Sequence, residues 1–257
     1  MTTPPSPQPS PSPQPPESTL AADLDAVRRH TTLLVEHAGA LRDVRAPSLC
    51  DGWSRAHVLA HVARNAEAIQ RLAQWAVDGT ARPMYPGGTA GRDAAIEEGA
   101  AQAGPASPDD PRPGGLLVDD LAATADALDP HLAALAGPLA VDRVEMRGGL
   151  LVPPLALPRL RLREVVFHHV DLDDGFTFAH VEPQMLRAFV DDAATRLGAF
   201  DDQPGLRLVS DEGDEWVVGD GALTVQGDRA GLLLWLARRD PRGVTAERAL
   251  PDLPRGS

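Results

Sequence analysis

Residues 54–77 have the sequence SRAHVLAHVARNAEAIQRLAQWAV, in which apolar residues recur at the spacing of an amphipathic helix. Ser54 is a residue type that commonly caps a helix N-terminus, so we expect the helix to start there and to run to about Val77. Its apolar stripe is formed by Val58, Val62, Ile69 and Leu72. A helix of this length needs partner helices to cover that stripe.

Three further long helices are predicted by apolar residues at helical spacing, at residues 20–41, 116–136 and 159–172. A shorter helix is expected to begin near Arg92 and to be broken by the segment GPASPDDPRPGG at 104–115, a linker or a surface insertion. Four long helices joined by loops favour a four-helix bundle.

The last third of the chain has a different pattern. Helices are expected at 183–198 and 229–238, and short strands between them at 206–209, 215–218 and 222–226. We therefore predict a mixed α + α/β fold, in which a helical bundle at 19–178 precedes a small α+β domain at 179–257. Residues 1–18 are nearly all Pro, Ser, Thr and Gln, which predicts a disordered tail.

Composition excludes several classes of protein. The chain has 257 residues, 37 acidic and 24 basic side chains, and a formal net charge of −13. All basic residues are arginines spread along the chain, which disfavours binding to nucleic acid or to an anionic membrane. The single cysteine excludes an internal disulfide framework, and there is no apolar run long enough to span a bilayer and no secretory signal. We expect a soluble, cytoplasmic and monomeric protein.

A first candidate for chemistry is the pair Glu164 and His168 in the predicted helix 159–172. Residues four apart on a helix lie on the same face, where a carboxylate and an imidazole can share one metal ion. In a strand the two would lie roughly 13 Å apart, too far for one ion. The alternative is a surface Glu–His pair that contributes only a few tenths of a kcal/mol.

His61 is the second candidate. With about 100° per residue, it lies closer than His57 to the centre of the apolar stripe and so faces the bundle core. It could be a buried neutral imidazole, or it could join Glu164 and His168. The resulting set of two histidines and one glutamate leaves a fourth tetrahedral position open, as in catalytic zinc sites. His169 points about 100° away from His168, so it is the weaker candidate for a ligand.

Two other features admit both a chemical and a structural interpretation. Cys50 precedes the predicted helix start, where the helix dipole would favour a thiolate, but a half-buried inert thiol is the simpler interpretation. Arg238 and Arg239 could bind a dicarboxylate through bidentate hydrogen bonds, or they could be solvated residues at a helix C-terminus.

Several motifs together resemble the mycothiol-dependent maleylpyruvate isomerases. They occur in family order from about Leu20 to the C-terminus: DGWSRAHVLAHVARNAEA at 51–68, PMY at 83–85, REVVFHHVDL at 163–172, and AGLLLWLARR at 230–239 with a Gly-Val pair at 243–244. The chain departs from the family in its Pro-rich start, in the segment 104–115, and at His169. None of these departures removes a candidate ligand.

The resemblance implies a DinB-like four-helix bundle that binds one zinc ion, followed by a sterol-carrier-like α+β domain. The implied zinc ligands are His61, Glu164 and His168, and the implied catalytic arginine is Arg239, with Arg238 as the near alternative. The implied cofactor is mycothiol, a low-molecular-weight thiol. The implied reaction converts maleylpyruvate to fumarylpyruvate by thiolate addition, bond rotation and elimination, in the gentisate route of aromatic-compound catabolism.

Two other functions are compatible with the same residues. A mycothiol-dependent S-transferase on this scaffold would use the same zinc and thiol chemistry with a different acceptor. A non-catalytic protein that binds a small ligand is the second alternative, but three polar side chains directed into a bundle are costly without a metal.

Overall fold

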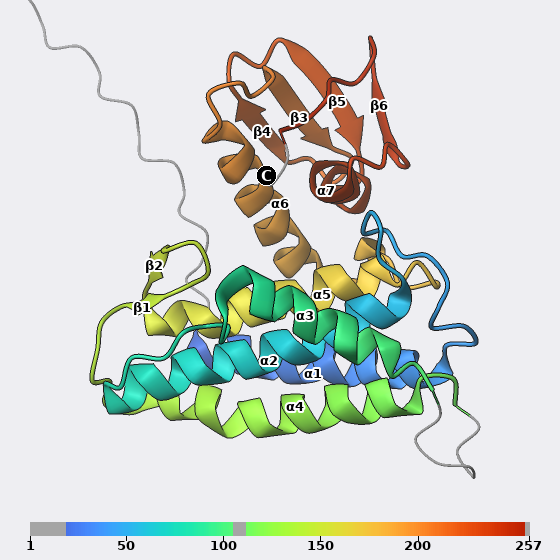
Figure 1. The fold of residues 1–257 in the computed structure, drawn as a ribbon. Coiled ribbons are helices and arrows are strands. Elements are labelled where there is room, and N and C mark those ends of the chain that lie inside the picture. The colour runs from blue at the N-terminus through green and yellow to red at the C-terminus, as the bar shows by residue number, and fades with distance from the viewer. Residues whose placement is uncertain (1–18, 105–111, 255–257) are drawn as a thin grey trace, which may run out of the picture.

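The computed structural model describes residues 19–104 and 112–254. The predicted tail at 1–18 and most of the segment 104–115 lie outside the described residues. Four long helices form the first part of the chain: α1 (Leu20–Ala40), α2 (Arg55–Asp78), α4 (Gly115–Ala133) and α5 (Leu157–Asp171). Both α1 and α2 contact α4 and α5, so the four helices make a closed bundle (Figure 1).

The bundle helices start and end close to the predicted residues. Thr19 caps α1 by accepting a hydrogen bond from the backbone N–H of Ala22, and Ser54 caps α2. Gly79 ends α2 in the left-handed conformation, which glycine adopts without steric cost. The short helix α3 (Gly88–Ala101) begins earlier than expected and packs along the outside of α2.

A small hairpin joins α4 to α5 and was not predicted. Its strands β1 (Val144–Glu145) and β2 (Leu151–Val152) have two residues each, too short for a periodic signal. Three one-turn 3₁₀ segments lie between α4 and α6, at Ala134–Ala136, Pro154–Ala156 and Phe178–His180.

The C-terminal part is built from two helices and a four-stranded sheet. The helices are α6 (Pro183–Gly198) and α7 (Arg229–Arg238), both at the predicted residues. The sheet has the order β4-β3-β5-β6, in which β3 and β5 are parallel and the other pairs antiparallel. Its strands are β3 (Leu206–Ser210), β4 (Glu215–Val218), β5 (Leu223–Gly227) and the unpredicted β6 (Val244–Ala246). Buried and exposed residues alternate along β3 and β5, and α6 and α7 cover the buried face (Figure 1).

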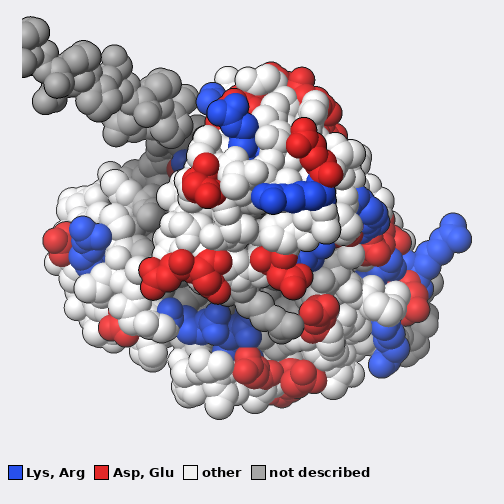
Figure 2. Space-filling model, turned by 90° about the horizontal axis from the view of Figure 1, so that it is seen from above, with Lys and Arg blue, Asp and Glu red and all other residues white. Residues whose placement is uncertain are grey.

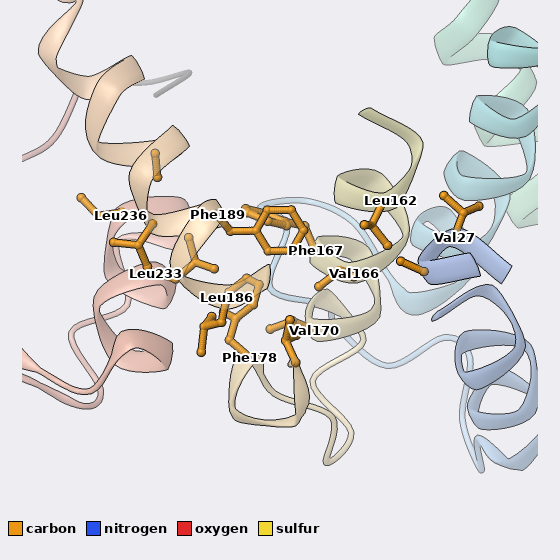
Figure 3. Packing of buried hydrophobic residues seen from close by; sticks show 14 of the residues in the cluster. Val27, Leu162, Val166, Phe167, Val170, Phe178, Leu186, Phe189, Leu233 and Leu236 are labelled. Carbon is orange, nitrogen blue, oxygen red and sulfur yellow. The ribbon is translucent and has the colours of Figure 1, made fainter. Parts of the chain in front are cut away.

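One apolar cluster runs from the bundle into the C-terminal part. Figure 3 shows the ring of Phe167 on α5 lying between side chains of the bundle and side chains of α6 and α7. The centroid of this ring lies 5.0 Å from that of Phe178 and 5.3 Å from that of Phe189, both in edge-to-face contact. The two parts of the chain therefore pack through a common core.

The mixed α + α/β prediction is confirmed. In the described residues no helix is both long and apolar enough to cross a bilayer. The face shown in Figure 2 carries acidic and basic side chains interspersed, with red side chains bordering a run of blue ones in its lower half.

Candidate active site

A pocket of about 1040 Å³ lies where the bundle meets the C-terminal part. Helices α2 and α5 supply one wall, which includes His61, Glu164 and His168. The end of α7 and the segment around Leu253 supply a second part of the wall. The three predicted ligands are thus brought to one side of the pocket, from two helices that are far apart in the sequence.

The three side chains converge closely. The Nε2 atom of His61 lies 3.0 Å from Oε2 of Glu164, and the same oxygen lies 3.6 Å from Nε2 of His168. The two imidazole rings meet edge to face, with centroids 4.6 Å apart. One donor atom from each residue can be chosen so that all three lie within 4.8 Å of one another.

The surroundings set the charge of each group. Burial and the neighbouring His168 lower the pKa of His61 to about 4, so this ring is neutral at pH 7. Burial opposes the ionisation of Glu164, but hydrogen bonds from His168 and His61 hold its pKa well below the usual range. Burial likewise opposes a charge on His168, yet its hydrogen bonds to Asp171, Cys50 and Glu164 raise its pKa well above the usual value.

These residues fit a divalent metal ion. Two imidazole nitrogens and one carboxylate oxygen are ligands that zinc accepts, and the three atoms are already close enough to share one ion. Cys50, His168 and Asp171 form a second group of possible ligands. However, both carboxylate oxygens of Asp171 are bound by Arg238, so this group is less suited to a metal.

Asp171 orients His168 from outside the proposed ligand set. Its Oδ2 accepts a hydrogen bond from Nδ1 of His168 at 2.8 Å, which leaves Nε2 directed to the pocket side. Burial opposes its ionisation, but the hydrogen bonds from Arg238 and His168 hold its pKa well below the usual range. A carboxylate behind a histidine ligand fixes the ring and raises its basicity in many metal sites.

The weaker candidates have structural partners. His57 lies at the start of α2, where its Nδ1 accepts a hydrogen bond from the backbone N–H of Ser54 and completes the cap. His169 is buried away from the pocket, stacked on Phe176 with ring centroids 3.6 Å apart. Cys50 is partly buried, lines the pocket and lies 3.2 Å from a carboxylate oxygen of Asp171.

The two neighbouring arginines differ in their partners. Arg238 forms a bidentate ion pair with the buried Asp171, with N–O distances of 2.5 and 2.6 Å. Arg239 ends α7 in the left-handed conformation, with φ of 59°. Its guanidinium donates to backbone carbonyls of the helix end and of Pro254, and its side chain lines the pocket.

Sequence reasoning missed part of the pocket lining. Arg92, Arg147 and Arg163 all line it, so the pocket is far more basic than the acidic chain as a whole. Arg92 approaches the ligand set directly, because its Nη2 lies 3.4 Å from Nδ1 of His61. Asp171 was also missed, although its position three residues after His168 on a helix is a signal for a side-chain pair.

Comparison with known proteins adds an independent line of evidence. A family model described as mycothiol maleylpyruvate isomerase N-terminal domain matches residues 24–173. The crystal structure of a mycothiol-dependent maleylpyruvate isomerase is similar, with a TM-score of 0.78 and 27% identity, covering 92% of this chain and 97% of that chain. The structure of a histidine-to-alanine mutant of a mycothiol-dependent maleylpyruvate isomerase gives a TM-score of 0.80, 25% identity and the same coverage. No curated protein matches the chain.

Proposed function

The chain belongs to the family of the mycothiol maleylpyruvate isomerase N-terminal domain, and we propose that it isomerises maleylpyruvate to fumarylpyruvate with zinc and mycothiol as cofactors. The observation that carries the proposal is the convergence of His61, Glu164 and His168 in a pocket that Arg239 also lines. The likeness of the whole chain to solved mycothiol-dependent isomerases supports it.

In this proposal, His61, Glu164 and His168 hold the zinc ion. Zinc bound there supplies Lewis acidity that lowers the pKa of a thiol, and the thiol supplies the nucleophile for reversible addition to the double bond. Asp171 keeps Nδ1 of His168 engaged, so that Nε2 stays available on the pocket side. The pathway assignment, the gentisate route of aromatic-compound catabolism, belongs to the same proposal.

Arg239 is the residue that we assign to the substrate. Maleylpyruvate carries two carboxylates, and a guanidinium binds a carboxylate through two parallel hydrogen bonds. Arg238 is already engaged in such a pair with Asp171, whereas Arg239 donates to backbone carbonyls at the end of α7 and to that of Pro254. A carboxylate is a stronger acceptor for a guanidinium than a neutral carbonyl, so substrate can replace these contacts.

A mycothiol-dependent S-transferase is the second candidate. The pocket volume of about 1040 Å³ is at the upper end of the range for small-molecule sites, which leaves space for a larger electrophile. An assay that compares maleylpyruvate isomerisation with conjugation of a model electrophile separates the two functions.

The test combines metal analysis of the purified protein with a maleylpyruvate assay with and without mycothiol. We expect about one zinc per chain and turnover only with the thiol, and we expect His61→Ala to lose both. His57→Ala is the matched control on the same helix, because it removes a cap worth about 1 kcal/mol and leaves the ligand set intact. Full zinc content in the His61→Ala variant would contradict the ligand assignment.

A further inference from the structure

Tyr85 is the only tyrosine in the chain, and it lines the pocket. It lies in the loop between α2 and α3 and is only 8% exposed. The guanidinium carbon of Arg92 lies 6.0 Å from the centre of its ring. A buried phenol needs hydrogen-bond partners, and these partners decide where its own hydrogen can point.

The side chain of Asn65, which also lines the pocket, is oriented by Arg161. Arg161 is fully buried in the bundle, and its Nη1 donates to the backbone carbonyl of Val62 and to Oδ1 of Asn65, both at 2.8 Å. Among the described residues, Nε and Nη2 of Arg161 have no hydrogen-bond partner. A flipped Asn65 amide would place its NH₂ against the guanidinium and cost Arg161 another bond, so the observed orientation is strongly favoured.

With its oxygen bound to Arg161, Asn65 offers only its NH₂ group on its other side. Asn65 and Arg92 line the same pocket as Tyr85, both act on the pKa of its phenol, and the guanidinium of Arg92, like the NH₂ of Asn65, can only donate. A phenol oxygen has two lone pairs and one hydrogen. Because both neighbours are donors, the phenol oxygen can act toward them only as an acceptor, and its O–H remains available for an acceptor in the pocket that Tyr85 lines.

We propose that Tyr85 is a catalytic residue that donates a hydrogen bond to the ketone oxygen of the substrate, and that Asn65 and Arg161 are positioning residues for it. This proposal rests on the proposed function. The ketone conjugated to the double bond of maleylpyruvate gains negative charge when that bond is attacked, and a fixed donor stabilises such an oxygen. The proton stays on Tyr85 throughout.

The electrostatics of the site agree with a donor role. Burial and the carboxylate of Glu164 raise the pKa of Tyr85, so the phenol keeps its proton at neutral pH. The alternative role for the O–H is to donate to Glu164 itself and so to support the metal ligand. The two roles differ in what is lost when the hydroxyl is removed.

The first experiment is Tyr85→Phe in the zinc-loaded enzyme. We expect kcat to fall about 100-fold with little change in KM, because the bond strengthens only as charge develops. Zinc content and zinc affinity should stay at the level of the unmodified enzyme. A kcat within threefold of that level would overturn the proposal, and so would a loss of zinc affinity that accounts for the loss of rate.

The second experiment measures binding rather than turnover. Acetylpyruvate carries the 2,4-dioxo acid group of maleylpyruvate but lacks the double bond, so it binds without reacting with a thiol. We expect Tyr85→Phe to weaken its binding to the zinc-loaded protein about tenfold by calorimetry, and equal binding would contradict the proposal. If the unmodified protein binds acetylpyruvate but does not isomerise maleylpyruvate, the proposed function is wrong. The difference in acetylpyruvate affinity between the unmodified protein and Tyr85→Phe then still tests whether Tyr85 donates to the ketone oxygen.

A double-mutant cycle tests the positioning role of Asn65. If Asn65 acts through Tyr85, Asn65→Leu lowers kcat in the presence of the phenol and has little further effect in Tyr85→Phe. Additive losses in the double variant would show an independent role. Melting temperatures of all variants distinguish these effects from partial unfolding, which matters because Asn65→Leu removes a partner of the buried Arg161.

Discussion

The charged side chains on the helical wall and on the C-terminal wall of the pocket differ in their hydrogen-bond partners. On the helical wall, Glu164 and His168 pair with groups of the same wall, and both lie on one face of α5. On the C-terminal wall, Arg238 pairs with the buried Asp171 of α5, and Arg239 donates to backbone carbonyls. The helical wall is a self-contained ligand set, whereas the C-terminal wall contributes positive charge.

This difference is consistent with two separate roles, metal binding on the helical wall and substrate binding on the C-terminal wall. A metal site needs ligands fixed to within a fraction of an ångström, and the packed helices α2 and α5 provide that precision. A group that binds substrate must exchange partners during turnover, and a guanidinium on neutral carbonyls can do so at small cost. Arg238 and Arg239, adjacent in sequence, therefore belong to different functions.

The largest effect on stability is expected for Arg238→Gln. This change leaves the buried carboxylate of Asp171 without its guanidinium, and losing one partner of a buried pair costs about 3–5 kcal/mol. Urea unfolding measures the loss, with Arg239→Gln as the matched control on the next residue. Equal free energies of unfolding for the two variants would show that Arg238 has no greater structural role than Arg239.

Arg239→Gln should act on turnover instead. We expect kcat/KM for maleylpyruvate to fall about 100-fold or more, which corresponds to roughly 2.7 kcal/mol, while zinc content stays unchanged. Steady-state kinetics and metal analysis on the same preparation check both parts. If Arg238→Gln binds a full complement of zinc but loses as much kcat/KM as Arg239→Gln, the assignment of substrate binding to Arg239 alone is wrong, and both arginines contribute.

A smaller, pH-dependent effect is expected at Asp214, which binds Arg229 at the first residue of α7 with an N–O distance of 2.5 Å. Burial opposes its ionisation, but the hydrogen bond from Arg229 lowers its pKa below the ordinary value. A lowered folded-state pKa gives stability that is present above about pH 4 and lost as the pH falls through the folded value.

Asp214→Asn should therefore lower the melting temperature at pH 7 by a few degrees, for a loss of about 1 kcal/mol. The difference from the unmodified protein should shrink as the pH falls below about 4. Thermal unfolding followed from pH 7 down to pH 3 gives the comparison. A constant difference over this range would show that the carboxylate charge does not hold the start of α7.

Much of the fold could be predicted from local patterns, and the pocket could be predicted only in part. Ser54 and the apolar stripe of α2 are local signals, so the position of that helix was predicted to within a residue or two. Helical periodicity also placed His61 toward the bundle core, and Glu164 and His168 together on one face of their helix. Their convergence in the structure agrees with that prediction, and their role as metal ligands remains a proposal.

The parts that were missed depend on contacts between distant segments. Strand β6 has three residues and exists because it pairs with β5, and the hairpin of β1 and β2 is shorter still. Arg92 reaches the pocket because α3 packs on α2, an arrangement that the sequence of α3 alone does not specify. The ion pair of Arg238 with Asp171 likewise needs the shared apolar core to bring α7 beside α5.

The backbone of Arg239 has a consequence for engineering. A residue with a side chain loses about 1 kcal/mol or more in the left-handed conformation, and glycine would relieve that strain at this helix end. A thermostabilisation screen that scores only folding would therefore favour glycine at position 239. Any such improved variant should be assayed with substrate before it is accepted, because the heat resistance would be gained by deleting the guanidinium.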